Sequence, residues 1–540
     1  MRTVDAGPTR KILKPEAEWG TLLARTRSIA PEAFGADGEP LNLIAGEWQA
    51  PGHRKTVLSP VDGSVLGHLP MIDEETARRA VRAAEREFGD WSKVDLDTRR
   101  ERVTATVDEL REHRDLLAYL LVWEIGKPFR QSLTEVDRML EGVEWYVAEI
   151  DSMMSGREPL GLISNIASWN NPLSVLGHAA LVQALAGNPI IAKTPTDGGL
   201  HTLTLTWAIA RRNGLPVSLV SGSGGQLSES LVRGEHIAAL AFVGGKATGR
   251  EVAASLLDRG KRIMLEMEGV NTMGIWDYSD WETFRGFVKK GYEYGKQRCT
   301  AYTRFVVQRS LFPEFLENYL DATRALRFGH PLLVDAPDDD PPDLDFGPMI
   351  NSSTVEDLRD QYARAVEGGA IMLHRGEFDE ELFLPSQDTS AYMRPVALLG
   401  VPPNATLYHS EPFGPIDSIV VVDRIEQLVS EMNVSNGALV ASILSDDRTD
   451  AERVASELRA YKVGINRLRS RGDREESFGG LGESWKGCFV GGHHLVDAVT
   501  RGPEGERHAG NSPDGVVRPA TRCAPRPGPA ARAAGQGRAR

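Results

Sequence analysis

Short apolar strands alternate with helical segments from Gly161 onward, and this alternation limits the possible folds more than any other feature of the chain. The expected strands cover residues 161–166, 189–192, 217–220 and 237–243. The expected helices between or after them cover residues 173–185, 200–212, 227–232 and 247–259. This order is typical of βαβ units, whose strands form a parallel sheet. A similar region follows from about Asn271 to Asn466, so the sequence predicts two α/β units.

The length of 540 residues and the two ends of the chain fit this division. A chain this long exceeds the usual size of one domain, so we expect at least two. Prolines interrupt the short helical patterns of residues 1–40, which we interpret as an N-terminal extension. Residues 335–345 are acidic and are interpreted as a solvated loop. Residues 503–540 contain six prolines, seven arginines and few large apolar side chains, which predicts a disordered tail.

Composition excludes several classes of protein. A formal net charge of −14 argues against a general nucleic-acid binder, which carries a basic surface. No apolar run approaches the length of a membrane span, and the first residues lack the apolar stretch of a secretory signal. The three cysteines are too few and too scattered for a disulfide framework. We therefore expect a cytoplasmic protein with reduced thiols, no membrane or nucleic-acid partner, and no metal site.

Three side chains supply the parts of a covalent catalyst. Cys299 lies in the polar, basic run Gly-Tyr-Glu-Tyr-Gly-Lys-Gln-Arg-Cys-Thr, Glu266 offers a carboxylate, and Asn170 offers an amide. A thiol nucleophile, a base and an oxyanion donor are what covalent chemistry on a carbonyl requires. Taken singly, each has a more common interpretation, because a lone cysteine is usually a small buried hydrophobe, a lone Glu is usually solvated, and Asn near Pro usually marks a turn.

Eight short motifs, in a fixed order from about Leu43 to Gly502, decide between these interpretations. Together they resemble the NAD(P)-dependent aldehyde dehydrogenase superfamily, of which the chain is identified as a divergent member. The motifs are Arg-Glu-Pro-Leu-Gly (157–161), Ser-Trp-Asn-Asn-Pro (168–172), Ala-Gly-Asn-Pro-Ile-Ile-Ala-Lys (186–193), Ala-Phe-Val-Gly-Gly-Lys-Ala-Thr-Gly (241–249), Leu-Glu-Met-Glu-Gly (265–269), Gln-Arg-Cys-Thr (297–300), Glu-Pro-Phe-Gly-Pro (411–415) and Ser-Phe-Gly-Gly (477–480).

The resemblance implies a reaction and a role for each catalytic residue. Cys299 would attack a small-molecule aldehyde, and the thiohemiacetal oxyanion would face the Asn170 amide and the backbone N–H of Cys299. Hydride transfer to the nicotinamide would leave a thioester, which water activated by Glu266 would hydrolyse to the carboxylic acid. Two alternatives stay open: a coenzyme A-acylating enzyme, which typically lacks this Glu, and a catalytically silent member that acts as a binding or structural protein.

The resemblance also implies NAD or NADP as cofactor. The family usually has Ser at the position of Gly245, and NAD-preferring members have Glu where this chain has Thr196, a change that allows NADP. Glu411 matches the carboxylate that binds the nicotinamide ribose. The positions expected to contact the cofactor are Ile166, Trp169, Lys193, Thr196, Gly224, Phe242, Gly244, Gly245, Glu411 and Phe413.

The domain boundaries follow from the same resemblance. The implied fold is aldehyde dehydrogenase-like α/β, with a Rossmann-type NAD(P)-binding domain of residues 41–145 and 161–270 and a catalytic domain of residues 271–466. Residues 146–160 and 481–502 are expected to form the oligomerisation segments. The first of these is shorter than in most members, so the hairpin is expected to be small or truncated. A homodimer or homotetramer is expected.

Departures from the family pattern surround the catalytic residues. Glu268 and Lys296 replace glycines that the family usually has beside the active site. Lys296 and Arg298 flank the nucleophile, where they either lower the pKa of Cys299 or point to solvent. Four arginines in residues 467–474 either bind an anion or serve as surface charge. We expect a small polar or anionic aldehyde, with the substrate-contacting positions Asn171, Arg298, Arg467 and Arg469.

Overall fold

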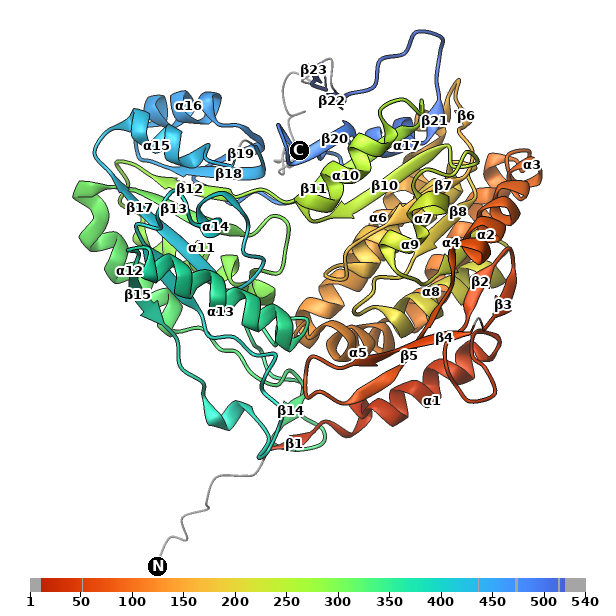
Figure 1. The fold of residues 1–540 in the computed structure, drawn as a ribbon, viewed down its shortest axis with the longest axis horizontal. Helices are drawn as coiled ribbons and strands as arrows, with labels where there is room; N and C mark the ends of the chain where they lie inside the picture. Colours follow the sequence, from red (N-terminus) through yellow and green to blue (C-terminus); the bar gives the residue numbers. More distant parts are fainter. Residues whose placement is uncertain (1–10, 51, 436, 472–473, 513–514, 520–540) are drawn as a thin grey trace, which may run out of the picture.

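The computed structural model describes residues 11–519, apart from residues 51, 436, 472–473 and 513–514. Two halves lie side by side, each built around one sheet with helices packed against it (Figure 1). The half formed by earlier residues contains the larger sheet, and the other half contains most of residues 271–466. The two α/β units expected from the alternation of strands and helices are therefore present.

Five parallel strands form the centre of the larger, ten-stranded sheet, in the order β9-β8-β7-β10-β11. The first of them in the chain, β7, is in the middle, so the strand order reverses between β7 and β10. Ligands of such sheets bind at the carboxyl ends of the strands beside this point. Antiparallel strands extend both edges. The ten strands are β2 (Asn42–Ile44), β3 (Glu47–Gln49), β7 (Ile163–Ile166), β8 (Ile190–Lys193), β9 (Val217–Val220), β10 (Ala239–Gly244), β11 (Arg262–Met267), β20 (Trp485–Cys488), β22 (Gly510–Ser512) and β23 (Gly515–Val517).

The central strands are short and apolar because helices cover both faces of the sheet. Every residue of β8 and β9 is buried, as expected for parallel strands between two layers of helices. The expected helix at 173–185 begins instead as a π-helical segment, Pro172–Gly177, and continues as α7. The helices of this half are α2 (Glu74–Arg86), α3 (Phe88–Trp91), α4 (Leu96–Glu112), α5 (Arg114–Ile125), α6 (Phe129–Met154), α7 (His178–Leu185), α8 (Leu200–Arg212), α9 (Gly224–Leu231), α10 (Lys246–Leu256) and α17 (His494–Ala498).

The second half is built on a seven-stranded sheet in the order β15-β16-β17-β13-β12-β18-β19, in which β15 alone of these strands runs antiparallel to its neighbour. Its strands are β12 (Asn271–Ile275), β13 (Tyr302–Gln308), β15 (Ile371–Arg375), β16 (Val396–Leu399), β17 (Ile416–Val422), β18 (Ala438–Leu444) and β19 (Ala460–Ile465). Its helices are α11 (Trp281–Gly291), α12 (Phe312–Arg324), α13 (Ser352–Glu367), α14 (Thr406–His409), α15 (Ile425–Met432) and α16 (Arg448–Glu457).

The N-terminal segment connects the two halves. Helix α1 (Trp19–Ile29) packs against α5 and α8, while strand β1 (Ile12–Leu13) pairs with β14 (Leu333–Val334). Lys14 donates hydrogen bonds to the carbonyl oxygens of Pro337 (3.4 Å) and Asp339 (2.8 Å). Part of the acidic loop that we interpreted as solvated is therefore fixed by a buried lysine. A separate hairpin, β4 (His53–Leu58) and β5 (Val65–Met71), lies in the same region.

The described parts of the expected oligomerisation segments and tail contain helices and strands of the fold. Residues 146–154 are the last turns of α6 rather than part of a hairpin, and what remains of the small sheet is β6 (Glu158–Pro159) paired with β21 (Thr500–Arg501). Strand β20, within the second expected oligomerisation segment, belongs to the ten-stranded sheet. The homodimer or homotetramer stays a prediction.

Residues 510–512 and 515–517, expected to be disordered, form β22 and β23 and extend the same sheet beyond β20. These short strands need little apolar surface of their own because they pair along an existing edge. Residues 513–514 and 520–540 of the expected tail lie outside the described residues. None of the described helices combines the length and the apolar composition needed to cross a bilayer.

Candidate active site

Cys299 lies in the loop between α11 and β13, and the backbone around it is unusual. A short 3-10 segment, Glu293–Lys296, precedes the cysteine, and Tyr294, Gly295 and Lys296 all have positive φ angles of 57°, 59° and 60°. Such angles cost free energy in residues other than glycine, so the surroundings must hold this segment in place. The Asn271 amide does so on the other side of Cys299, by donating to the carbonyl oxygens of Cys299 (2.8 Å) and Ala301 (3.0 Å).

Lys296 neither activates the nucleophile nor points to solvent, so both interpretations of this residue were wrong. Its side chain is fully buried and forms an ion pair with Asp417 at 2.9 Å, which is also fully buried. The ammonium donates to the carbonyl oxygen of Tyr302 at 2.7 Å, and the Tyr319 hydroxyl donates to Asp417 at 2.7 Å. The lysine therefore anchors the segment before Cys299 to the core of the second half.

Glu266 ends up beside Cys299, although 33 residues separate them in the chain. It lies near the end of β11 and is 2% exposed. One carboxylate oxygen, Oε2, accepts a hydrogen bond from Arg471 at 2.9 Å, while Oε1 has no hydrogen-bond partner among the described residues. Burial, followed by the neighbouring Glu266 carboxylate, raises the pKa of the Cys299 thiol well above its usual range, and Arg471 opposes this effect.

Asn170 lies on the other side of the nucleophile loop, in the loop after β7. Its amide nitrogen donates to the carbonyl oxygen of Gln297 at 3.0 Å, and its amide oxygen accepts from the Ser168 hydroxyl at 2.7 Å. The buried Lys127 ammonium donates to the backbone oxygen of Asn170 at 3.0 Å and forms an ion pair with Glu135. The structure thus brings the three expected catalytic residues together around one loop.

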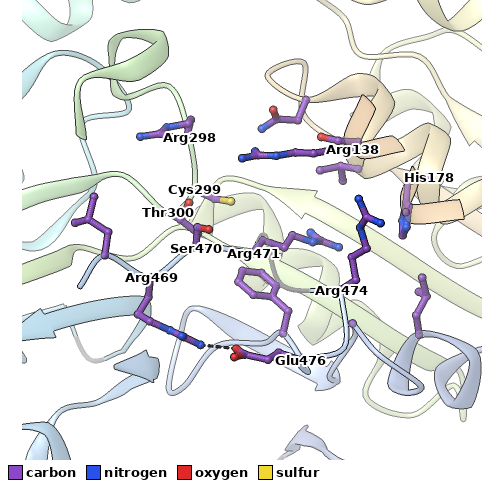
Figure 2. Close-up of a pocket in the computed structure, with 18 of the residues that line it drawn as sticks. Arg138, His178, Arg298, Cys299, Thr300, Arg469, Ser470, Arg471, Arg474 and Glu476 are labelled. Atoms are coloured by element: carbon purple, nitrogen blue, oxygen red, sulfur yellow. Dashed lines mark hydrogen bonds and ion pairs between the residues drawn. The ribbon is translucent and has the colours of Figure 1, made fainter. Parts of the chain in front are cut away.

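A cavity of about 240 Å³ opens next to Cys299, between α6 and residues 468–471 and 474. Figure 2 shows the Cys299 sulfur directed into the space bounded by Arg138, Arg471 and Arg474. The lining residues used below are Arg138, Asn171, His178, Arg298, Arg471 and Arg474. His178 is half-buried, and burial lowers its pKa to about 3, so the cations of the lining at neutral pH are the arginines and Lys290.

The arginines of the cavity differ in their partners. Arg474 forms an ion pair with Glu141, Arg471 with Glu266, and Arg298 with Glu293 at 3.3 Å. Arg138, on α6, has no carboxylate partner among the described residues, and it is exposed at the cavity. A guanidinium without a partner is suited to bind a carboxylate or phosphate in two-point geometry.

The four expected substrate-contacting residues are placed differently. Asn171 and Arg298 line the cavity, and Asn171 accepts a hydrogen bond from Lys127 at 3.0 Å. Arg469 also lines it but forms an ion pair with Glu476. Arg467 is exposed and is not part of the lining, which corrects its expected role.

Sequence reasoning missed Arg138 and Asn271. Arg138, Gly142 and Tyr146 recur every fourth residue, a spacing that places them on one face of α6, and all three line the cavity. That spacing is a signal that could have identified Arg138. Asn271 offered no comparable signal, because its role depends on the distance between β12 and the nucleophile loop.

The expected cofactor-contacting residues gather at the carboxyl ends of the parallel strands. Strands β7, β8 and β10 end at or next to the positions expected to contact the cofactor, and α9 and α10 begin there. Gly224 and Gly245 have open space where a side chain would be. This is the edge at which the strand order reverses, where open α/β sheets bind dinucleotides. The positions concerned are Ile166, Lys193, Gly224, Phe242, Gly244 and Gly245.

Aromatic and acidic side chains close this region toward Cys299. The centroid of the Trp169 ring lies 5.9 Å from that of Phe413 and 6.2 Å from that of Tyr294, and both pairs are edge-to-face. Glu411 is 6% exposed, and neither of its carboxylate oxygens has a hydrogen-bond partner among the described residues. A buried carboxylate without a donor is costly unless a ligand supplies one, and the hydroxyl groups of a ribose are suitable donors. The residues present therefore fit a dinucleotide.

Thr196 and Lys193 lie at the far end of this region. Burial lowers the pKa of Lys193 to about 8, and Asp197 opposes this effect. Lys55 donates to the carbonyl oxygen of Thr196 at 3.3 Å and forms an ion pair with Asp197 at 2.9 Å. Two ammonium groups near Thr196 can accommodate an additional phosphate.

Known proteins similar to this chain are aldehyde dehydrogenases. The model of the aldehyde dehydrogenase family matches residues 48–502. The chain is 27% identical over 464 residues to the non-phosphorylating aspartate-semialdehyde dehydrogenase of Halomonas elongata, which covers 82% of this chain and 91% of that protein. It is 25% identical over 456 residues to the 3,6-anhydro-alpha-L-galactose dehydrogenase of a Vibrio species, covering 81% and 92%.

The fold agrees with that of solved members. A structure of betaine aldehyde dehydrogenase from Staphylococcus aureus in complex with NAD+ superposes with a TM-score of 0.78 at 22% identity, covering 89% of this chain and 96% of that one. The family match spans most of the chain, and the identity to the curated relatives is near one quarter. The chain therefore belongs to the aldehyde dehydrogenase family, as a divergent member.

Proposed function

We propose that this enzyme oxidises small anionic aldehydes to carboxylic acids, with NAD or NADP as the hydride acceptor and Cys299 as the nucleophile. The observation that carries the proposal is the cavity in which the Cys299 thiol faces arginine side chains, one of them, Arg138, without a carboxylate partner among the described residues. The relatives named above act on chemically different aldehydes, so the substrate class is argued from this cavity.

The first step is nucleophilic attack. The Glu266 carboxylate, whose Oε1 atom has no hydrogen-bond partner among the described residues, interacts with the thiol and takes its proton, which leaves a thiolate to attack the aldehyde carbon. The former carbonyl oxygen becomes an oxyanion, toward which the Asn170 amide turns from its contact with Gln297. Arg471 holds the other oxygen of Glu266 and fixes the orientation of the base.

A bound nicotinamide dinucleotide would supply the hydride acceptor that oxidation of the thiohemiacetal on Cys299 to a thioester requires. Glu411 supplies carboxylate oxygens to a ribose, and Trp169 and Phe413 exclude water from the reacting atoms. Glu266 first loses the thiol proton to solvent and, as a carboxylate again, removes a proton from water. The resulting hydroxide attacks the thioester, and the carboxylic acid leaves as the thiolate of Cys299 is released.

The anionic group of the substrate is expected to bind at the mouth of the cavity. Arg138 has no competing carboxylate there, whereas Arg298, Arg471 and Arg474 are already paired. Binding the anion to an unpaired guanidinium avoids the cost of breaking an existing ion pair. The preference should therefore depend on Arg138 more than on the other arginines.

The test is nucleotide reduction with NAD and NADP over a panel of hexanal, benzaldehyde and semialdehyde acids. We expect semialdehyde acids to have the highest kcat/KM and Cys299→Ala to abolish turnover. Arg138→Gln should raise KM for the semialdehyde acids by roughly tenfold and leave KM for hexanal unchanged. Arg467→Gln, a matched change outside the cavity, should alter neither.

Each part of the proposal is contradicted by a different experimental result. Equal turnover of hexanal and semialdehyde acids would contradict the substrate class, and turnover that survives in Cys299→Ala would contradict the role of the nucleophile. Product release as a coenzyme A thioester instead of a free acid would support the acylating alternative. Absence of turnover together with retained nucleotide binding would support a silent member.

The compartment and the assembly follow from the same proposal. A thiol nucleophile needs reducing surroundings, which supports a cytoplasmic location. A homodimer or homotetramer is proposed by likeness to the family, and size-exclusion chromatography with light scattering tests it.

A further inference from the structure

Glu268 occupies a position at which the family pattern has glycine, and its side chain reaches into the region proposed to bind the dinucleotide. It directly follows β11, and its Oε1 atom accepts a hydrogen bond from the backbone N–H of Lys246 at 3.2 Å. Lys246 is the first residue of α10, and the N-cap residue before it, Gly245, has no side chain to cap the helix. The carboxylate therefore satisfies a donor that a capping side chain would otherwise satisfy.

The first turn of α10 is where an anion is most favourable. The unpaired N–H groups and the helix dipole concentrate partial positive charge at this end, which stabilises phosphate or carboxylate groups. On the proposed function, the pyrophosphate of the cofactor would bind at this turn. A carboxylate of the protein itself, that of Glu268, accepts a hydrogen bond at this turn.

Glu411 gives independent support, because it shows how acidic this region is. It is 6% exposed, has no hydrogen-bond donor among the described residues, and its pKa is raised well above the usual range. The causes are burial, then the Glu268 carboxylate, with a further contribution from Glu266, and Lys246 opposes them. Glu268 and Glu411 thus both interact with Lys246 at the start of α10, which on the proposed function a doubly charged pyrophosphate would approach.

The cations nearby are already engaged. Arg471 is paired with Glu266, and Arg250 of α10 with Glu483. Lys246 faces both Glu268 and Glu411, and these two carboxylates act against the burial that lowers its pKa. The attraction that Lys246 would offer to a pyrophosphate is therefore partly used by Glu268.

We propose that Glu268 competes with the cofactor: its carboxylate occupies the anion position at the start of α10, and a dinucleotide binds by displacing it. This inference rests on the proposed function, because it takes α10 as the pyrophosphate-binding helix. Displacement frees the N–H of Lys246 and its ammonium for the phosphates. The enzyme therefore binds dinucleotides more weakly than the same fold with a neutral residue at 268.

The test is isothermal titration of the full-length protein with NAD+, NADP+, ADP-ribose and adenosine. Glu268→Gln keeps the shape and removes the charge, whereas Glu268→Gly restores the residue of the family pattern. Both variants should bind NAD+, NADP+ and ADP-ribose about tenfold more tightly than the wild-type protein, because one repulsive charge next to the pyrophosphate is lost. Adenosine, which has no phosphate, should bind all three proteins equally.

A matched control is Glu251→Gln, which removes an exposed carboxylate from the same helix beyond its first residues. It should leave every dissociation constant unchanged. Unchanged or weaker dinucleotide binding in Glu268→Gln, with dinucleotide binding intact in the wild-type protein, overturns the inference and leaves the proposed function standing. If neither the wild-type protein nor any variant binds NAD+ or NADP+, the proposed function is overturned.

Discussion

At the scale of single residues, the proposed nucleophile, Cys299, has neighbours that disfavour its ionisation. Burial and Glu266 raise the pKa of Cys299, while Arg471 lowers it. A thiol in such a place stays protonated, and so protected from oxidation, until a base takes its proton. Glu266 suits this arrangement because the same carboxylate that opposes the thiolate can accept the thiol proton.

The balance of these charges is testable through the pH dependence of alkylation. Only the thiolate reacts, so the rate of alkylation of Cys299 by iodoacetamide should rise as the pH passes upward through its elevated pKa. Glu266→Gln removes a carboxylate that raises this pKa, so the midpoint should move to lower pH. Arg471→Met removes the opposing cation, so the midpoint should move to higher pH. Mass spectrometry of the peptide that contains Cys299 measures the rate, with Cys299→Ala as background.

If the midpoint in Glu266→Gln stays at the wild-type pH, the Glu266 charge does not affect the pKa of Cys299. If the midpoint moves to higher pH, the sign of that effect is contradicted. Cys488 is an internal reference, because it is buried and its pKa is raised to about 11. The charged groups that shift its pKa are unchanged in these variants, so the midpoint of its own alkylation should be the same in all of them.

Thr196 allows a prediction about cofactor choice. Thr196→Glu adds a carboxylate where Lys55 and Lys193 provide positive charge, so it should weaken NADP+ binding by roughly tenfold or more through repulsion of the 2′-phosphate. NAD+ binding should change little. Titration of both nucleotides measures the ratio, and Thr196→Gln separates charge from size. Equal effects of Glu and Gln would show that the 2′-phosphate does not bind near residue 196.

At the scale of elements, the segment Glu293–Lys296 shows how an unfavourable backbone is maintained. Lys296 has a φ of 60°, a conformation in which glycine is favoured. The ion pair with Asp417 compensates by joining this segment to β17. Replacing Lys296 thus has two opposite effects, since glycine would relax the backbone but leave Asp417 buried without its cation.

The second effect should dominate. Lys296→Gly and Lys296→Met should both lower the free energy of unfolding by about 3 kcal/mol or more, because an unpaired buried carboxylate costs more than one strained residue gains. Arg309→Met breaks a pair with Asp423 in which both side chains are more than half exposed, and should lower the free energy of unfolding far less than either change at Lys296. Urea denaturation measures all three. A Lys296→Gly protein as stable as the wild type would contradict the anchoring role.

Particular elements show what the sequence could predict. Strand β9 and helix α8 have the expected bounds, because each is a regular apolar pattern ended by turn residues or charges. Cys299, Glu266 and Asn170 could be proposed as a group because their motifs are local, and the structure places them around one loop. Arg138, Asn271 and the partner of Lys296 depend on distances between elements far apart in the chain, which local patterns do not encode. The role of Glu268 required both a residue type and the position of α10.

At the scale of the whole molecule, the C-terminal strands complete the larger sheet. Asn511 in β22 donates to the carbonyl oxygens of Gly482 (2.8 Å) and Trp485 (2.6 Å), and β22 covers the edge of β20. An uncovered edge strand presents unpaired backbone groups that promote aggregation. Residues 510–512 and 515–517, which lie in the tail predicted to be disordered, therefore cover the edge of the sheet.

Truncation tests this role. A chain ending at Ala509 should lose roughly 2 kcal/mol of stability, because the carbonyl oxygens bound by Asn511 lose their donor, and it should aggregate more readily on heating. A chain ending at Pro519 keeps β22 and β23 and should have the same Tm as the full-length protein. Thermal unfolding with light scattering measures both. Identical behaviour of the two truncated chains would contradict the protective role of the strands.

The attachment of the N-terminus to the second half has a consequence for synthesis. Lys14 contacts the backbone of Asp339, 325 residues later in the chain. At about 5–20 residues per second, the ribosome needs roughly 16–65 seconds to produce that partner. During this interval β1 has no strand to pair with and Lys14 has no carbonyl oxygens to bind. The first segment to be made is thus among the last to reach its final position, and until then it is available to chaperones and proteases.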